Sequence, residues 1–252
     1  MKRIVALILV ILSFCFSITL AASPEEQSAK EWFGQGKHYI SLKEYQKAID
    51  AFTKVIQIEP RAEAYYNRGV VYGNLNRTKL AIQDYTKAIE LNPRYTLAYY
   101  NRGNSYYILS QLDRAIEDYT KVIELNPQYV PAYNNRGVAY KDLKQFNQAI
   151  QDYTKAIEVR PQDLNTYYNR GVVFQILEQW DRAIDDYTKI IEIDSKAAEA
   201  HYHRGKLYEK LNQKEKAIDD YQIFLRYADP NSMANPIKTA KKRISFLKDE
   251  NK

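Results

Sequence analysis

The sequence has few of the residues that build chemical sites. Its 252 residues include one cysteine, Cys15, and three histidines. A single cysteine excludes an intramolecular disulfide and a metal site made of several thiolates. Two of the histidines, His201 and His203, are two positions apart, so a helix would direct them to different faces. The sequence therefore predicts neither metal binding nor histidine-based catalysis.

Glycine and proline are also scarce, with eight of each. Six of the glycines occupy one recurring position, described below, which leaves Gly34 and Gly73 and provides no glycine-rich loop for a phosphate group. The acidic residues are spread along the chain, and no pair of them suggests general acid and base roles. We therefore expect no catalytic residues, no cofactor and no enzymatic activity.

The chain also lacks a strong excess of charge of one sign. It has 37 lysines and arginines against 31 aspartates and glutamates, which gives a formal charge of +6. Basic and acidic residues alternate along much of the sequence, a pattern typical of a solvated surface with ion pairs rather than of a basic face for nucleic acid. We expect no nucleic-acid partner on this evidence.

The long hydrophobic run in the chain lies at its N-terminus. Lys2 and Arg3 precede the apolar residues 4–16, and small residues including Ala21 and Ala22 follow. A charged start, an apolar middle and a small-residue exit are typical of a secretory signal. We interpret residues 1–22 as a signal peptide with cleavage near Ala21 or Ala22, followed by a short lead at 23–28.

An uncleaved membrane anchor is the alternative interpretation of this segment. At about 1.5 Å per residue, a helix over residues 4–22 is just long enough to cross a bilayer of about 30 Å. Lipid attachment at Cys15 is disfavoured, because the bulky Phe14 precedes it where a small residue is needed. The mature protein would then reach the periplasm either free or held at the membrane.

The recurring glycines reveal an internal repeat. Five of them are spaced 34 residues apart, and the first precedes the second by 33: Gly36, Gly69, Gly103, Gly137, Gly171 and Gly205. A fixed period of this length indicates a solenoid. With glycine placed at position 8, the span 29–230 divides into six repeats: 29–61, 62–95, 96–129, 130–163, 164–197 and 198–230.

The same register explains the surplus of tyrosine, 23 against eight phenylalanines and two tryptophans. Position 20 of every repeat is alanine, and positions 4, 11 and 24 are nearly always aromatic; in repeat four these are Ala149, Tyr133, Tyr140 and Tyr153. Positions 4, 8 and 11 share one helical face, as do positions 20, 24 and 27. Each repeat is therefore predicted to be a pair of amphipathic helices that buries its apolar face against its neighbours.

With this pattern, residues 29–227 resemble the tetratricopeptide repeat family. The segments 98–103 and 114–119 carry the resemblance most clearly, and the departures are few: Asp194 and Ser195 replace Asn-Pro, His201 replaces an aromatic residue and Phe224 replaces a small one. The resemblance implies an all-α fold, a right-handed superhelical solenoid of antiparallel helix pairs. It also implies a role in binding other proteins.

The C-terminal segment 231–252 has the pattern of a capping helix. Asn235 and Pro236 are residues typical of a helix start. Apolar residues follow at helical spacing, namely Ile237, Ala240, Ile244 and Leu247. A solenoid needs such a polar-faced terminal unit. The alternative is that the basic residues 241–243 form a patch for nucleic acid or anionic lipid, which we consider the weaker interpretation.

Arginine recurs at position 7 and aspartate at position 23, sixteen residues later. The pairs are Arg68 with Asp84, Arg102 with Asp118, Arg136 with Asp152, Arg170 with Asp186 and Arg204 with Asp220. Repeat one has Gln35 and Ala51 instead, so both charges are absent together. We therefore predict that these residues pair across the two helices of each repeat, as structure rather than as an anion-binding row.

Position 6 is asparagine in four repeats and has no evident core role: Asn67, Asn101, Asn135 and Asn169. In proteins of the family this face lines the inner groove, and in superhelical members such as the O-linked N-acetylglucosamine transferases an asparagine row there holds an extended peptide by its backbone. The resemblance implies the same role for these four residues. Tyrosines accompany the row at position 5: Tyr66, Tyr100, Tyr168 and Tyr202, with Asn134 interrupting. Simple duplication of repeats is the alternative explanation.

These patterns together predict a non-catalytic scaffold outside the cytoplasm, in the periplasm. Its groove, centred on the four asparagines with Tyr66, Tyr100 and Tyr168, would bind an extended segment or a helix of a partner protein. The alternative is a membrane-tethered assembly factor resembling the tetratricopeptide pilotins of secretion and pilus systems, which would keep its N-terminal segment or a lipid.

Overall fold

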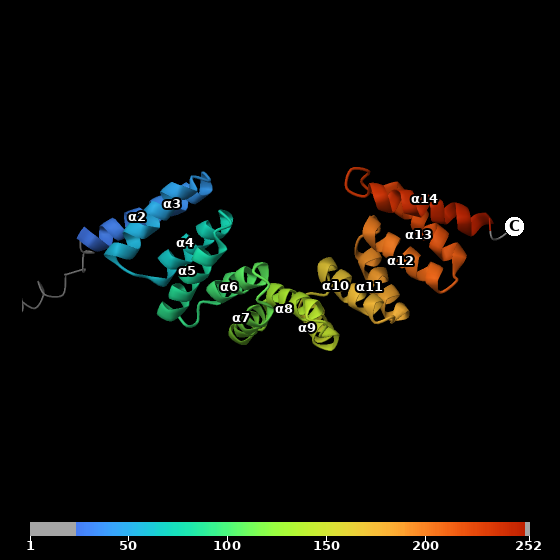
Figure 1. Ribbon diagram of the computed structural model, residues 1–252, viewed down its shortest axis with the longest axis horizontal. Coiled ribbons are helices and arrows are strands. Elements are labelled where there is room, and N and C mark those ends of the chain that lie inside the picture. The colour runs from blue at the N-terminus through green and yellow to red at the C-terminus, as the bar shows by residue number, and fades with distance from the viewer. Residues whose placement is uncertain (1–23, 250–252) are drawn as a thin grey trace, which may run out of the picture. The chain divides into compact units, whose positions relative to one another are not determined.

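The computed structural model describes residues 24–249, and within this range it contains thirteen helices and no strand (Figure 1). The all-α fold and the pairing of helices into a solenoid are thereby confirmed. The proposed signal peptide at 1–22 and Cys15 lie outside the described residues. The chain divides into two compact units, residues 1–105 and 106–252, each of which is described by itself.

The first unit contains the helix pairs of repeats one and two and the start of repeat three. Its helices are α2 (Pro24–Ser41), α3 (Tyr45–Ile58), α4 (Ala62–Asn74), α5 (Thr78–Leu91) and most of α6 (Thr96–Ile108). Helix α2 packs on α3, α3 on α4, and α4 on α5. Helix α2 begins at Pro24, ahead of the predicted start of repeat one at residue 29.

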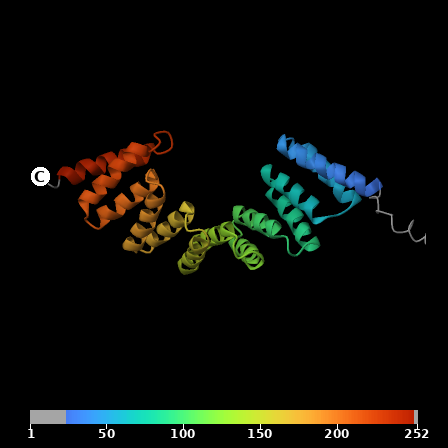
Figure 2. The same ribbon diagram turned by 180° about the vertical axis from the view of Figure 1, so that it is seen from behind.

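The second unit continues the same alternation of first and second helices, seen from behind in Figure 2. Its helices are α7 (Leu112–Leu125), α8 (Val130–Asp142), α9 (Phe146–Val159), α10 (Leu164–Ile176), α11 (Trp180–Ile193), α12 (Ala198–Lys210), α13 (Lys214–Tyr227) and α14 (Ala234–Asp249). Helix α14 buries Ala240 and Leu247 against Tyr221 and Phe224 of α13, so it covers the last repeat as a cap does.

The core of each repeat depends on the close approach of its two helices at position 8. A Cβ atom added at Gly137 would lie 2.7 Å from the ring of Tyr153, which is fully buried at position 24. Gly69 stands in the same relation to Tyr85 at 2.8 Å. Any larger residue would displace a ring that has no free space around it. Glycine therefore recurs at position 8 because the ring at position 24 of the second helix occupies the space that any side chain at position 8 would need.

The turn inside each repeat uses a left-handed residue without glycine. Position 15 has a positive φ in all six repeats: Lys43, Asn76, Ser110, Lys144, Glu178 and Asn212. In repeat four the backbone N–H of Gln145 donates to the carbonyl of Tyr140 at 2.8 Å, and that of Lys144 to Lys141 at 2.9 Å. These two bonds terminate the first helix in a Schellman-type arrangement. The sequence pattern alone did not indicate this strained position.

Candidate functional site

The arginines at position 7 belong to the framework that joins the helices. Arg136 donates two parallel hydrogen bonds to the carboxylate of Asp152, at 2.8 and 2.6 Å, and Asp152 is buried. The same bidentate pairing links Arg68 to Asp84, Arg170 to Asp186 and Arg204 to Asp220. The prediction of structural pairing is confirmed for these four; Arg102 and Asp118 fall on either side of the boundary between the units.

Each arginine also holds the preceding repeat, a contact that sequence analysis missed. The third guanidinium nitrogen donates to a threonine at position 25 of the repeat before: Arg68 to Thr53, Arg102 to Thr86, Arg136 to Thr120, Arg170 to Thr154 and Arg204 to Thr188. The recurrence of threonine at position 25 was a visible signal. The arginine side chain lies between the rings of positions 4 and 11, as Arg136 does between Tyr133 and Tyr140.

Repeat six extends this network through His201, which replaces the aromatic residue at position 4. The side chain is buried, with Nδ1 2.8 Å from Asp220 Oδ1 and Nε2 3.2 Å from the carbonyl oxygen of Ser195. Asp220 also accepts from Arg204. His201 thus completes a structural cluster, and in residues 24–249 no three His, Cys, Asp or Glu side chains are grouped to hold a metal ion.

The asparagines at position 6 lie on a different face of the first helices. We define the groove face as positions 5 and 6 together with position 34, the residue that directly precedes the next first helix. The amides of these asparagines differ in what they contact. Asn67 Nδ2 donates to the carbonyl of Glu63 in its own helix at 2.7 Å. Asn101 Nδ2 donates to the hydroxyl of Tyr66, in the preceding repeat, at 3.0 Å. These two amides are therefore occupied by the protein itself.

Asn169 differs from both, because its amide makes no side-chain hydrogen bond within residues 24–249. The residue that would match Tyr66 in the preceding repeat is Asn134, and Asn134 is engaged elsewhere. Its Nδ2 donates to Asp163 at 3.2 Å, and its Oδ1 accepts from the hydroxyl of Thr166 at 2.8 Å. Asp163 in turn caps α10 by accepting from the backbone N–H of Thr166. Asn169 is thus left with its donors and acceptor available.

A hollow of about 390 Å³ lies beside Asn169, between repeats four and five. We call it the polar hollow. Its lining includes Asn134, Asn135, Arg160, Asp163, Tyr168 and Asn169. Three of the predicted site residues, Asn135, Asn169 and Tyr168, are therefore brought together here. The remaining four, Asn67, Asn101, Tyr66 and Tyr100, belong to the first unit, whereas this hollow lies in the second.

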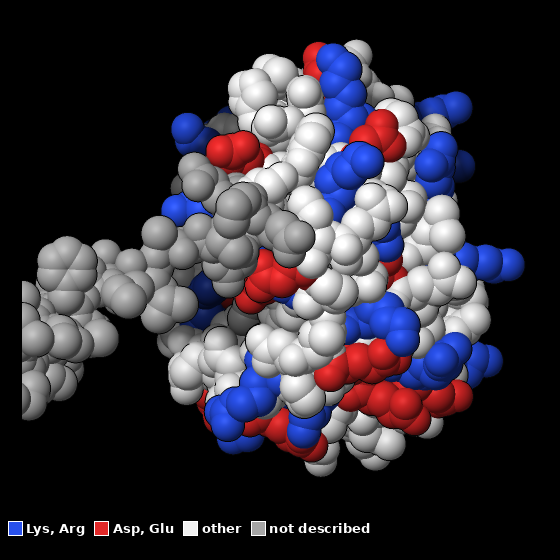
Figure 3. All heavy atoms as spheres, turned by 90° about the vertical axis from the view of Figure 1, so that its left-hand side faces the viewer, with Lys and Arg blue, Asp and Glu red and all other residues white. Residues whose placement is uncertain are grey.

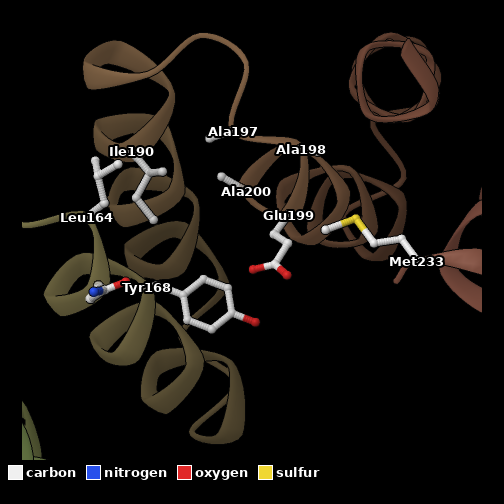
Figure 4. A pocket seen from close by; sticks show the side chains of 9 residues that line it. Leu164, Tyr168, Ile190, Ala197, Ala198, Glu199, Ala200 and Met233 are labelled. Carbon is white, nitrogen blue, oxygen red and sulfur yellow. The ribbon is translucent and has the colours of Figure 1, made fainter. Parts of the chain in front are cut away.

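A second hollow, of about 450 Å³, is also lined by Tyr168 and lies between repeats five and six (Figure 4). We call it the apolar hollow. Leu164, Ile190, Ala197, Ala198 and Ala200 provide its apolar lining, and Met233, from the segment before α14, closes one side. Glu199 and the hydroxyl of Tyr168 point into the same space (Figure 4). Asn165 lines both hollows, which places them next to each other along the groove face.

Tyr168 is held in place by the next repeat. Its hydroxyl lies 3.1 Å from His203 Nε2, and the two rings meet edge to face with centroids 5.4 Å apart. Burial raises the pKa of Tyr168, and the negative charge of Glu199 raises it further. Burial also lowers the pKa of His203 to about 4, with a smaller contribution from Lys206. Both groups are therefore neutral near pH 7 and present a fixed aromatic wall.

The structure adds residues that sequence analysis did not assign to the site, namely Asn165, Ile190, Glu199 and Met233. Met233 lies outside the repeats, so no periodicity could have found it. On the face that Figure 3 shows, lysines and arginines are interspersed with aspartates and glutamates. In the described range no helix has the length and hydropathy needed to cross a membrane.

Comparison with known proteins identifies the repeats. Models of the tetratricopeptide repeat match residues 29–61, 62–95, 96–129, 130–163, 165–196 and 198–226. A search of the curated proteins gives no match.

Solved structures share the fold. YrrB, described as a tetratricopeptide protein with an unusual peptide-binding site, is 25% identical with a TM-score of 0.64, over 77% of this chain and all of YrrB. MamA is 24% identical with a TM-score of 0.64, over 69% and 95%. The C-terminal part of a tetratricopeptide protein from Cytophaga hutchinsonii is 19% identical with a TM-score of 0.77, over 87% and 89%.

Six consecutive matches span most of the chain, and they fall on helix pairs whose framework of arginine, aspartate, glycine and tyrosine repeats in the same positions. The predicted family is therefore confirmed, and the chain belongs to the tetratricopeptide repeat family.

Proposed function

We propose that this protein is a non-catalytic scaffold of the periplasm, and that it binds an extended segment of a partner protein along the groove face of repeats four to six. The family and its structural neighbours support a role in protein interaction. The observation that carries the proposal is the amide of Asn169, which makes no hydrogen bond within residues 24–249 and lines the polar hollow together with Asn135.

The chemistry of the polar hollow suits a polypeptide backbone. A side-chain amide offers two donors and an acceptor, so it can bond the N–H and C=O of one extended residue. Arg160 and Asp163 add one charge of each sign to the same lining. Such a site recognises the backbone of an extended segment with little demand on its side chains. YrrB, whose description names a peptide-binding site, supports this assignment by analogy.

The location outside the cytoplasm rests on residues 1–22, with their charged start, apolar middle and small-residue exit. The membrane-tethered assembly factor is the competing proposal, and it requires that this segment or a lipid be retained. The mass of the mature protein distinguishes them. A first residue at Ala22 or Ser23 supports the free periplasmic protein, and an intact or lipidated N-terminus supports the tethered one.

Binding of nucleic acid or anionic lipid through α14 is the weakest alternative. Arg243, in the centre of its basic residues, forms an ion pair with Glu209 of α12 and lies over the ring of Phe246 at 4.6 Å. A charge engaged in this way contributes less to a basic patch. Binding of the protein to oligonucleotides that weakens steeply with salt would favour this alternative over a peptide groove.

The test is site-specific photocrosslinking in the native host. A photoreactive residue at Asn165, which is exposed and lines both hollows, should capture a partner polypeptide. The same probe at Gln151, an exposed residue of α9 that lines neither hollow, is the control. Capture from Asn165 should be lost when Asn135→Ala and Asn169→Ala are combined. Equal capture from Gln151, or capture that survives the double substitution, would reject the groove.

A further inference from the structure

We infer that the apolar hollow is a pocket for an aromatic side chain of the partner segment, and that a lysine or arginine next to that side chain pairs with Glu199. The inference rests on the proposed function, because it assumes that a polypeptide lies along the groove face. It adds a sequence preference, which backbone recognition by asparagine alone does not provide.

The first argument is a comparison with the junction of repeats two and three, where the equivalent space is filled. There Tyr66 at position 5 packs against Tyr95 at position 34 in a tilted arrangement, with ring centroids 4.9 Å apart and an interplanar angle of 38°. The hydroxyl of Tyr66 accepts a hydrogen bond from Asn101 at position 6 of the next repeat. The protein thus covers this tyrosine with a second ring of its own.

The junction of repeats five and six keeps the first ring and lacks the second. Tyr168 stands at position 5, and its hydroxyl contacts His203 at position 6, as Tyr66 contacts Asn101. Position 34, however, is Ala197, which carries no ring. Ala197 and Tyr168 both line the apolar hollow. The space open here therefore corresponds to the place of an aromatic ring that the chain itself supplies at Tyr95.

The lining of the apolar hollow matches an aromatic occupant. Tyr168 offers a ring already fixed by His203, so an incoming ring can pack against it in an offset or edge-to-face arrangement. Leu164, Ile190 and Ala200 provide apolar contact on one side, and the flexible thioether of Met233 lies opposite (Figure 4). Thioethers adapt to aromatic edges better than branched side chains do.

The charge of Glu199 favours a basic residue next to the aromatic residue of the partner segment. Glu199 is the acidic residue of the lining, its carboxylate points into the hollow, and it forms no ion pair within residues 24–249 (Figure 4). A carboxylate that faces the bound segment favours a cation and disfavours an acidic residue there, even at an exposed position. The partner segment is therefore expected to contain an aromatic residue flanked by lysine or arginine, with its adjoining backbone on Asn169 in the polar hollow.

The experiment is selection of random dodecapeptides, displayed on phage, against the full chain. We expect enrichment of an aromatic residue next to lysine or arginine. Binding of the selected peptide should weaken about tenfold or more in Ala197→Tyr, which supplies the missing ring. The backbone accommodates tyrosine at this position, because Tyr129 occupies position 34 with φ −83° and ψ 80°, close to the −63° and 83° of Ala197.

Two further measurements protect the test against misfolding of that variant. Glu199→Lys changes an exposed side chain and should reverse the charge preference, so that peptides with an acidic neighbour are selected. Met233 and Met1 are the two methionines of the chain, and a ¹³C-methyl methionine spectrum of the wild-type protein therefore reports on the hollow through one of two signals. An aromatic peptide should shift the Met233 signal upfield, and its alanine analogue should leave it unchanged.

The outcomes separate this inference from the function on which it rests. If peptides are selected without an aromatic preference, bind Ala197→Tyr normally and lose affinity in Asn135→Ala with Asn169→Ala, the aromatic pocket is rejected and the peptide groove stands. If no selected peptide depends on either set of substitutions, both are rejected. An aromatic preference lost in Ala197→Tyr, together with the charge reversal and the Met233 shift, supports the inference.

Discussion

The seam between paired helices and the groove face differ in how strictly they repeat. At the seam, arginine, glycine, alanine, aspartate and an aromatic ring occupy the same positions in repeats two to six, and the contacts of Arg136 with Asp152 recur in every pair that lies within one unit. On the groove face, the rings of Tyr66 and Tyr95 pack against each other, whereas Asn134 donates a hydrogen bond to Asp163, and Tyr168 faces a hollow. The comparison teaches that the seam carries stability and that the variable positions beside it are available for recognition.

Breaking a buried ion pair of the seam should have the largest effect. Asp152→Ala removes the two carboxylate oxygens that accept from Arg136 and leaves it only the hydroxyl of Thr120. The arginine side chain is 16% exposed, so its charge would be stranded at a cost of about 3–5 kcal/mol in the free energy of unfolding. Urea denaturation measures this loss. A double-mutant cycle with Arg136→Ala should show a coupling of about 1–3 kcal/mol.

The matched control for this prediction is Lys155→Ala. Lys155 pairs with Glu158 on the surface of α9, where the two side chains are 61% and 55% exposed, and its removal should leave stability unchanged. Purely additive effects of Asp152→Ala and Arg136→Ala would show that the seam does not depend on the pair.

Gly137→Ala should be the next most harmful change at the seam. The new methyl group would lie 2.7 Å from a fully buried ring, so the helices must separate, at a cost of about 2 kcal/mol. Gly34→Ala is the control, because the residue is exposed and a Cβ atom added there would have no neighbour within 4 Å. In that helix the substitution should stabilise the protein by up to about 1 kcal/mol. The same sign for both variants would contradict the packing argument.

His203, which holds Tyr168 in the wall of the apolar hollow, should make the free energy of unfolding depend on pH. His203 has a pKa of about 4 in the folded state against 6.5 for an exposed histidine, so between these values the unfolded chain binds more protons. Stability should therefore fall as the pH is lowered from 6.5 to 4, by up to about 3 kcal/mol. His203→Asn places the residue common at position 6, and it should reduce the change in melting temperature between pH 6.5 and 4. An unchanged pH profile in the variant would remove His203 as the cause.

The smallest effects separate two asparagines of the groove face. Asn101→Ala breaks a hydrogen bond to Tyr66 and should cost about 1 kcal/mol, whereas Asn169→Ala should change stability by less than about 0.5 kcal/mol. Capture of a partner through the Asn165 probe should respond in the opposite order, with loss only in Asn169→Ala. Equal stability losses in both variants would erase the distinction between occupied and available amides.

The seam was largely predictable from the sequence, because its residues contact one another within one period. The sixteen-residue spacing of Arg136 and Asp152 predicted their pairing, and the shared helical faces placed positions 8 and 24 in the core. The direct contact of Gly137 with the ring of Tyr153 emerged only from the structure. The threonine contacts were missed, since they join different repeats.

The site was only partly predictable. The four asparagines look equivalent in sequence, yet Asn169 is distinguished by what Asn134 does in the preceding repeat. The apolar hollow exists because position 34 of repeat five is the small residue Ala197 and not an aromatic one. The sequence shows the alanine, but only the structure shows that no other side chain fills the space. Met233 comes from a segment without periodicity, so its position depends on the packing of α14.

The bond from each arginine to the threonine before it bears on how the array folds. Opening one repeat removes Thr120 from Arg136 or Thr154 from Arg170, and so weakens the polar cluster of an intact neighbour. Within each unit this makes nearest neighbours form together, as in a one-dimensional zipper. Repeat one lacks both charges, so amide hydrogen exchange should spread inward from α2 and α3, while the amides around Arg136 and Arg170 exchange last.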